Sequence, residues 1–97
     1  MRDTVLTVHL AITGRVQGVG YRESLRAVAS AVHVAGWVRN RANGSVEAVV
    51  QGKEKDVERV IVWCQGGPLG ARVESVKSKP VEKSEMFAKF VTMPTAD

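Results

Sequence analysis

The 97-residue sequence has few of the residues that build disulfides and metal centres. Its one cysteine, Cys64, excludes a disulfide within the chain and is typical of a reducing compartment, so we expect a cytoplasmic protein. The His, Cys, Asp and Glu residues nowhere show metal-ligand spacing, which predicts a site without a metal or another cofactor. Apolar runs cover only a few residues, and the N-terminus lacks the apolar segment of a signal peptide, so we expect no membrane association.

The overall composition is that of an ordinary globular protein, with 44% hydrophobic and 25% charged residues. The length suits a single domain spanning residues 1–97. The net charge of +4 is mild and does not by itself indicate a nucleic-acid partner. Five arginines nevertheless lie between positions 14 and 41, beside a single acid, Glu23. This region is therefore either a solvated basic face or a positive field that attracts an anionic substrate.

Hydrophobic periodicity predicts alternating strands and helices. Residues 4–13 alternate as a strand with one strongly buried face, whereas residues 22–33 place apolar side chains at i, i+3, i+4 and i+7. The pair Asn43-Gly44 is a strong hairpin signal. We expect strands at 4–13, 34–41, 45–51, 71–79 and 86–93, and helices at 22–33 and 53–65. This β-α-β-β-α-β order with one further short strand is ferredoxin-like: an α+β sandwich with two helices on one face of a largely antiparallel sheet.

This arrangement and the residue pattern carry four further expectations. The loop after the first strand should lie close to the end of the strand at 34–41. The strand at 71–79 should be an edge, protected by lysines and by Pro80. Cys64 falls on the apolar stripe of the second helix and should be a core residue, whereas His9 should be a surface or cross-strand histidine.

The segment Gly14–Arg22, with the sequence GRVQGVGYR, follows a strand signal and precedes a helix signal. Its three glycines let the backbone turn tightly and present successive N–H groups to an anion. The helix that follows adds its own unpaired N–H groups and the positive end of its dipole. Arg22 stands at that helix start, where a cation is disfavoured unless an anion lies beside it. The segment is therefore either an ordinary connector with two surface arginines or a loop that binds a small phosphate-like group.

Two well-known nucleotide-binding loops do not fit this segment. A P-loop requires a lysine after its last glycine, and none follows Gly18 or Gly20. The dinucleotide fingerprint requires a third glycine at the position of Glu23. A small anion is therefore a better ligand for the loop than a nucleotide.

Asn40 is the second unusual polar residue. Asparagine is depleted in strands, yet Asn40 lies at a predicted strand end on the same inward face as Val38. It either begins the hairpin turn or serves as a fixed amide that orients a water molecule through its donor and acceptor groups.

Two stretches of the chain, Gly14–Arg22 and Gly36–Asn40, the second followed by Asn43–Glu47, resemble the two signature motifs of the acylphosphatase family. Weaker similarities run through residues 63–73 and 87–90, so that the resemblance covers nearly the whole chain. The departures are a Tyr at position 21 where Phe is more usual, Gly20 at a variable position, and Thr92 where an apolar residue is more usual.

The resemblance implies a metal-independent hydrolase that converts an acyl phosphate to a carboxylate and inorganic phosphate. It implies Arg22 and Asn40 as catalytic residues, with Arg22 binding the phosphoryl group and Asn40 holding the attacking water. It also implies that backbone N–H groups bind the phosphoryl oxygens, from Gln17, Gly18, Val19, Gly20, Tyr21 and Arg22. We further expect a monomer whose partner is its small-molecule substrate.

Two other functions fit the same fold. An RNA-binding module requires exposed aromatic residues on the central strands, and Trp37 is the only aromatic residue in the first three predicted strands, which argues against it. A stand-alone anion-binding or regulatory domain is the stronger alternative, because a fold alone does not determine function. The presence of both Arg22 and Asn40 favours the enzyme.

Overall fold

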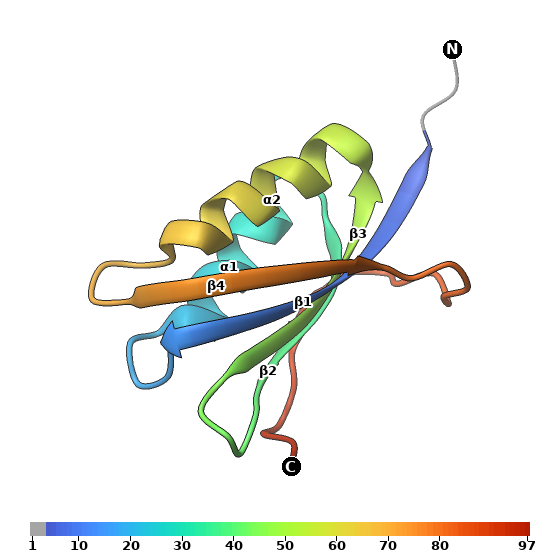
Figure 1. Cartoon of the computed structure of the whole chain (residues 1–97). Helices are drawn as coiled ribbons and strands as arrows, with labels where there is room; N and C mark the ends of the chain where they lie inside the picture. The colour runs from blue at the N-terminus through green and yellow to red at the C-terminus, as the bar shows by residue number, and fades with distance from the viewer. Residues whose placement is uncertain (1–3) are drawn as a thin grey trace.

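The computed structural model describes residues 4–97, so the first three residues of the expected domain lie outside the described range. Five strands and two helices follow in the predicted order (Figure 1). They are β1 Val5–Arg15, α1 Tyr21–Ala31, β2 Ala35–Asn40, β3 Val46–Lys53, α2 Glu54–Gly66, β4 Arg72–Pro80 and β5 Phe90–Thr92.

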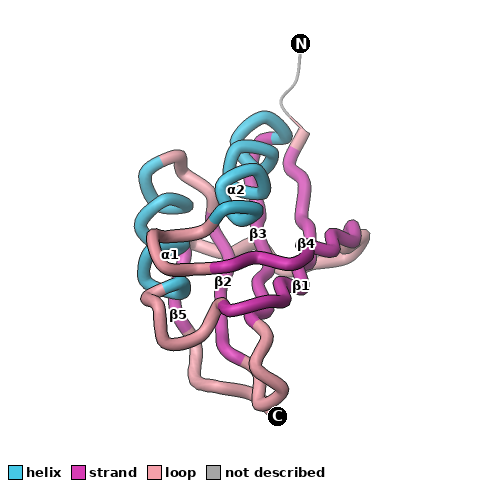
Figure 2. Tube along the Cα trace, turned by 60° about the vertical axis from the view of Figure 1, so that its left-hand side comes forward, coloured by secondary structure: helices cyan, strands magenta, loops and turns pink. Residues whose placement is uncertain are grey.

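The strands form one sheet in the order β4-β1-β3-β2-β5. All neighbouring pairs are antiparallel except β2 and β5, which run parallel. Both helices cover the same face of this sheet, and the other face is left open (Figure 2). This confirms the predicted ferredoxin-like α+β sandwich, with β1 and β3 at the centre of the sheet.

The core lies between the sheet and the helices. Alternate residues of β1 and β3 point toward the helices, because successive side chains of a strand face opposite sides. The apolar stripes of α1 and α2 meet them, and each fully buried Val or Leu contributes about 1.5–3 kcal/mol. The core includes Leu10, Ile12, Leu25, Ala29, Val46, Ala48, Val50, Val57, Val60 and Cys64, all of them at most 1% exposed. The placement of Cys64 in the core is confirmed.

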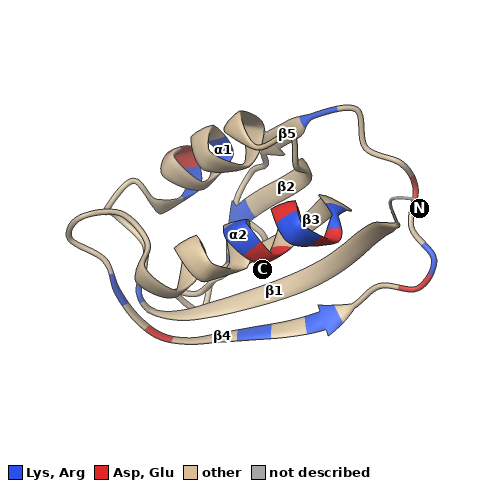
Figure 3. Ribbon diagram, turned by 90° about the horizontal axis from the view of Figure 1, so that it is seen from above, with Lys and Arg blue, Asp and Glu red and all other residues tan. Residues whose placement is uncertain are grey.

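β4 forms one edge of the sheet, as the sequence predicts for residues 71–79. Figure 3 shows positively charged positions along this outer strand. The last predicted strand, 86–93, is wrong in its length, since only Phe90–Thr92 pairs with β2. Before this strand, the Phe87 N–H donates to the Gln51 side chain (Oε1, 2.9 Å) and not to a neighbouring strand.

β1 continues beyond its predicted end and takes in Gly14 and Arg15. The pairing register with β4 shifts between Thr13 and Gly14, which marks an irregularity of the bulge type. Gly14 has φ +122°, and a Cβ atom there would lie 2.1 Å from the carbonyl oxygen of Arg72. Gly14 therefore serves the close approach of β1 and β4, rather than the phosphate loop to which the sequence assigned it.

An ion-pair network lies on the open face of the sheet, around Glu47 of β3. His9 Nε2 and Glu47 Oε2 are 2.7 Å apart, and Arg39 Nε donates to Glu47 Oε1 at 2.8 Å. The expectation of a cross-strand role for His9 is confirmed. Partial burial acts to raise the pKa of Glu47, but the hydrogen bonds from His9 and Arg39 outweigh it and lower that pKa below its usual value.

This network predicts a pH-dependent contribution to stability. A carboxyl group whose pKa is lower in the folded state stabilises the fold above its unfolded pKa of about 4.3, and loses this effect as the pH falls through the folded value. We expect Glu47→Gln to lower the free energy of unfolding by roughly 1–2 kcal/mol at pH 7. The difference from the wild type should shrink at pH 2–3, as urea denaturation at both pH values would reveal. An equal difference at both pH values would contradict the assigned role of the charge.

Candidate active site

The turn between β1 and α1 spans Val16 to Gly20 and is anchored at both ends by buried side chains. Val16 is 1% exposed, and Tyr21, the first residue of α1, is 2% exposed. Between them, Gly18 and Gly20 have φ values of +76° and +78°, a left-handed conformation that glycine adopts without strain. The backbone therefore reverses sharply between two fixed points.

The backbone amides of this turn are free to bind a ligand. No N–H group from Gln17 to Arg22 donates to an acceptor within residues 4–97. Gly20 is the N-cap of α1, and no side chain supplies a capping hydrogen bond there. The positive end of the helix dipole and a run of unpaired N–H groups thus meet at one place, which is the arrangement of an anion site.

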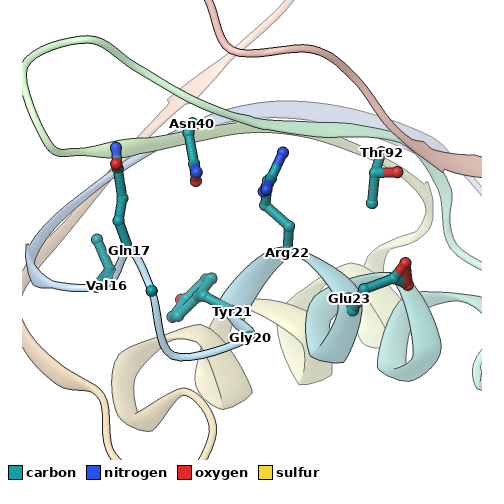
Figure 4. Close-up of a pocket in the computed structure, with 9 residues that line it drawn as sticks. Val16, Gln17, Gly20, Tyr21, Arg22, Glu23, Asn40 and Thr92 are labelled. Carbon is teal, nitrogen blue, oxygen red and sulfur yellow. The ribbon is translucent and has the colours of Figure 1, made fainter.

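Arg22 extends from the first turn of α1 toward β2, between Asn40 and Thr92 (Figure 4). Among the described residues, no acid or other acceptor binds its guanidinium. The neighbouring Glu23 carboxylate does not compensate this charge, because Arg26 Nε donates to Glu23 Oε1 at 2.8 Å. An uncompensated cation therefore lies beside the free amides.

Asn40 is the last residue of β2 and faces this turn from the opposite side (Figure 4). It pairs with Val46, so it belongs to the strand and does not begin the hairpin turn. That turn is stabilised by Asn43, whose Oδ1 accepts from the Ser45 N–H at 3.0 Å and the Ser45 hydroxyl at 2.6 Å. The Asn40 side-chain amide makes no hydrogen bond within residues 4–97 and is available to a ligand or water.

These groups line one cavity of about 230 Å³. Its walls are Val16, Gln17, Gly18, Gly20, Tyr21, Arg22, Glu23, Asn40 and Thr92. Of the predicted site residues, only Val19 is not in the wall, because its side chain packs against the core. The structure thus brings together the loop, Arg22 and Asn40, as the sequence predicts, and adds Thr92 from β5.

The Tyr21 side chain is structural. Its hydroxyl donates to the Cys64 carbonyl oxygen at 2.7 Å, and its ring lies 5.5 Å from that of Trp63. Burial raises the pKa of the Tyr21 hydroxyl far above its usual value and raises the pKa of the Cys64 thiol to about 11. Both groups therefore stay protonated at neutral pH, and the thiol is no nucleophile. A Phe in place of Tyr21 could not tie the turn to the end of α2 in this way.

The Gln17 side chain has a role that the sequence does not reveal. Its Nε2 donates to the carbonyl oxygens of Arg41 at 2.8 Å and Ser45 at 2.9 Å, both in the β2–β3 hairpin. No sequence pattern indicates these contacts, because Arg41 and Ser45 lie far from Gln17 along the chain. The side chain thus joins the turn to the strand end that carries Asn40.

Comparison with known proteins assigns the family. The model of the acylphosphatase family matches residues 8–92. The chain belongs to the acylphosphatase family. An acylphosphatase of Thiobacillus denitrificans is 53% identical over 76 residues, which cover 78% of this chain and 85% of that protein. One of Pyrobaculum arsenaticum is 48% identical over 88 residues, covering 90% and 93% of the two chains.

The fold agrees with a solved structure from the same family. An acylphosphatase structure from Coxiella burnetii superposes with a TM-score of 0.88 at 31% sequence identity. The match covers 92% of this chain and 93% of the other. Neither helix of residues 4–97 is long and apolar enough to cross a membrane, and no group of three or more His, Cys, Asp and Glu residues in that range could hold a metal ion.

The site predicts that Arg22 dominates binding of inorganic phosphate. Losing its charge-assisted hydrogen bonds should weaken phosphate binding roughly 10- to 100-fold in Arg22→Gln. Isothermal titration with phosphate measures this directly. Arg59→Gln is the matched control, because Arg59 is exposed on α2 outside the cavity and its loss changes the net charge equally. Equal weakening in both variants would reduce the effect to a general loss of positive charge.

Proposed function

We propose that an acyl phosphate binds with its phosphoryl group against the Gln17–Arg22 amides and the Arg22 guanidinium, while Asn40 holds the attacking water. The activity is that of the family: the chain is an enzyme that hydrolyses acyl phosphates to a carboxylate and inorganic phosphate. The observation that carries the assignment of residues is the uncompensated Arg22. It shares one small cavity with the unpaired amides of the turn and with the unpaired amide of Asn40.

The chemistry of the substrate explains why so few groups suffice. An acyl phosphate is a mixed anhydride, and its carboxylate is a good leaving group, so the protein needs no acid to protonate it. The remaining task is to position the phosphoryl group and stabilise the charge on its oxygens. A planar guanidinium donates two parallel hydrogen bonds to two such oxygens, which a lysine cannot do. Fixed backbone N–H groups need no reorganisation, and one such donor is worth roughly 10²–10³ in rate.

Asn40 aligns the water without taking its proton. A carboxamide does not accept a proton at neutral pH, but it can both donate a hydrogen bond to water and accept one from it. The proton released during attack passes to an oxygen of the phosphoryl group itself. In this scheme the protein supplies geometry and positive charge, and the substrate supplies the base.

We also propose that the enzyme acts as a monomer in the cytoplasm, without a nucleic-acid partner. Trp37 is the one aromatic residue in the strands that the RNA-binding alternative would use, and the guanidinium of Arg39 lies 4.8 Å from its ring centroid. That contact occupies one face of the only ring that these strands offer for base stacking. The buried thiol of Cys64 is consistent with a reducing environment.

Hydrolysis of benzoyl phosphate, with a chelator present, tests the roles of the residues. We expect Asn40→Ala to reduce kcat at least about 10²-fold, because an unaligned water reacts slowly. Its affinity for inorganic phosphate should stay within about threefold of the wild type, since the phosphate ligands are unchanged. The control Arg59→Gln lies on α2 outside the cavity and away from the hairpin, and should retain most of the activity.

Two results would contradict the proposal in different ways. If phosphate affinity fell in parallel with kcat in Asn40→Ala, the asparagine would hold the turn and not the water. If the wild type bound phosphate but hydrolysed no acyl phosphate, the chain would be an anion-binding domain that shares the family fold.

A further inference from the structure

The proposed active site consists of two halves on separate elements. The amides of Gln17–Arg22 and the Arg22 guanidinium belong to one continuous segment, whereas Asn40 belongs to β2. These halves are not adjacent in the sheet, because β3 lies between β1 and β2. In-line attack requires the water on Asn40 and the phosphorus on the turn to be correctly placed relative to each other. The ladders of β3 with β1 and with β2 bring the two halves to the same end of the sheet, and a direct contact between the halves would fix their separation further.

The Gln17 side chain is the hydrogen-bonded link between them. Within residues 4–97, its two bonds are the only side-chain hydrogen bonds recorded between the turn and the β2–β3 hairpin. One acceptor, the Arg41 carbonyl, directly follows Asn40 in the chain. Figure 4 shows the Gln17 side chain reaching from the turn to the hairpin beside Asn40.

Both ends of this link are rigid. The side chain of the preceding Val16 is buried, so the start of the turn cannot move without opening the core. At the other end, the Arg41 N–H donates to the Ser45 carbonyl at 2.8 Å and closes the hairpin. The Nε2 of Gln17 thus donates both of its N–H groups to the two residues that close the hairpin. Because both of its ends are fixed, the Gln17 side chain sets the distance between the turn and the hairpin.

We propose that the Gln17 side chain is a positioning residue for hydrolysis, which holds the phosphate-binding turn and Asn40 at the separation that in-line attack requires. This inference rests on the proposed function. Gln17 acts through Asn40 and need not touch the phosphoryl group with its side chain. The buried side chains of Val16 and Tyr21 anchor the phosphate-binding turn at both ends without the Gln17 side chain, so loss of the link should lower turnover and leave phosphate binding nearly unchanged.

The first test compares Gln17→Met with Gln51→Met. Methionine keeps the length of the side chain but has no donor. Gln51 is a matched control at the far end of the sheet: its Nε2 also donates twice, to Thr7 Oγ1 at 3.0 Å and to the Glu85 carbonyl at 2.9 Å. With benzoyl phosphate as substrate, Gln17→Met should lower kcat roughly 10- to 100-fold. Its inhibition constant for inorganic phosphate should stay within about threefold, while Gln51→Met should lower stability and leave kcat of the folded protein near that of the wild type.

A double variant separates a positioning role from a structural one. If Gln17 acts through the water on Asn40, Gln17→Met should lower kcat less than about threefold in an Asn40→Ala background, because that water is already unaligned. A loss of kcat in the double variant equal to the product of the losses in the two single variants would overturn the proposal. So would a wild-type kcat in Gln17→Met, or a loss of phosphate affinity equal to the loss of kcat.

The variant Gln17→Glu provides a pH readout if the methionine variant does not fold. An ionised carboxylate faces two carbonyl oxygens with no proton to donate, whereas the protonated form donates one. The kcat of Gln17→Glu relative to the wild type should therefore rise as the pH falls and the carboxylate becomes protonated. A flat ratio over the same fall in pH would count against the link. Absence of activity in the wild type would refute the proposed function instead, so the two failures are distinguishable.

Discussion

An uncompensated positive charge at the start of α1 is the constraint on which the site depends. A cation at a helix N-terminus is unfavourable by about 0.3–1 kcal/mol, and Arg22 has no acidic partner among residues 4–97 to offset this. The unpaired amides of the preceding turn add further positive partial charge at the same place. The negative charge of a bound phosphoryl group compensates both the Arg22 charge and the partial charge of the amides. The local instability of the free enzyme is therefore part of its affinity for an anion.

The topology of the sheet explains why Asn40 lies opposite this charge. β1 and β2 are each antiparallel to β3, so they run parallel to each other although they are not neighbours. β5 is parallel to β2. The carboxyl ends of all three strands therefore lie at the same end of the sheet. The turn after β1, Asn40 at the end of β2 and Thr92 at the end of β5 converge there as a direct result of strand direction.

The sequence predicts those parts of the molecule that depend on local patterns. Periodicity is enough for the two helices and the main strands, and the unusual positions of Arg22 and Asn40 indicate the site. Prediction from the sequence fails where the role of a residue depends on a partner that is distant in the chain. The sequence pattern places Gly14 in a loop, but the structure shows that its role is close contact with β4. The acceptors of the Gln17 side chain lie in the hairpin, far from Gln17 in the sequence. Before β5, the Phe87 N–H likewise donates to the distant Gln51 side chain and not to a neighbouring strand.

The turn is thus held at three separate points. Val16 fixes it to the core, Tyr21 joins it to the last turn of α2, and Gln17 joins it to the hairpin. The Tyr21 hydroxyl also satisfies a backbone carbonyl in the last turn of α2, which has no partner within that helix. Val16 and Tyr21 fix the backbone donors that lie between them, so these donors need no rearrangement as charge develops on the phosphoryl oxygens, whereas Gln17 sets their distance from Asn40. The fold therefore provides the preorganisation that a site without a strong acid or base requires.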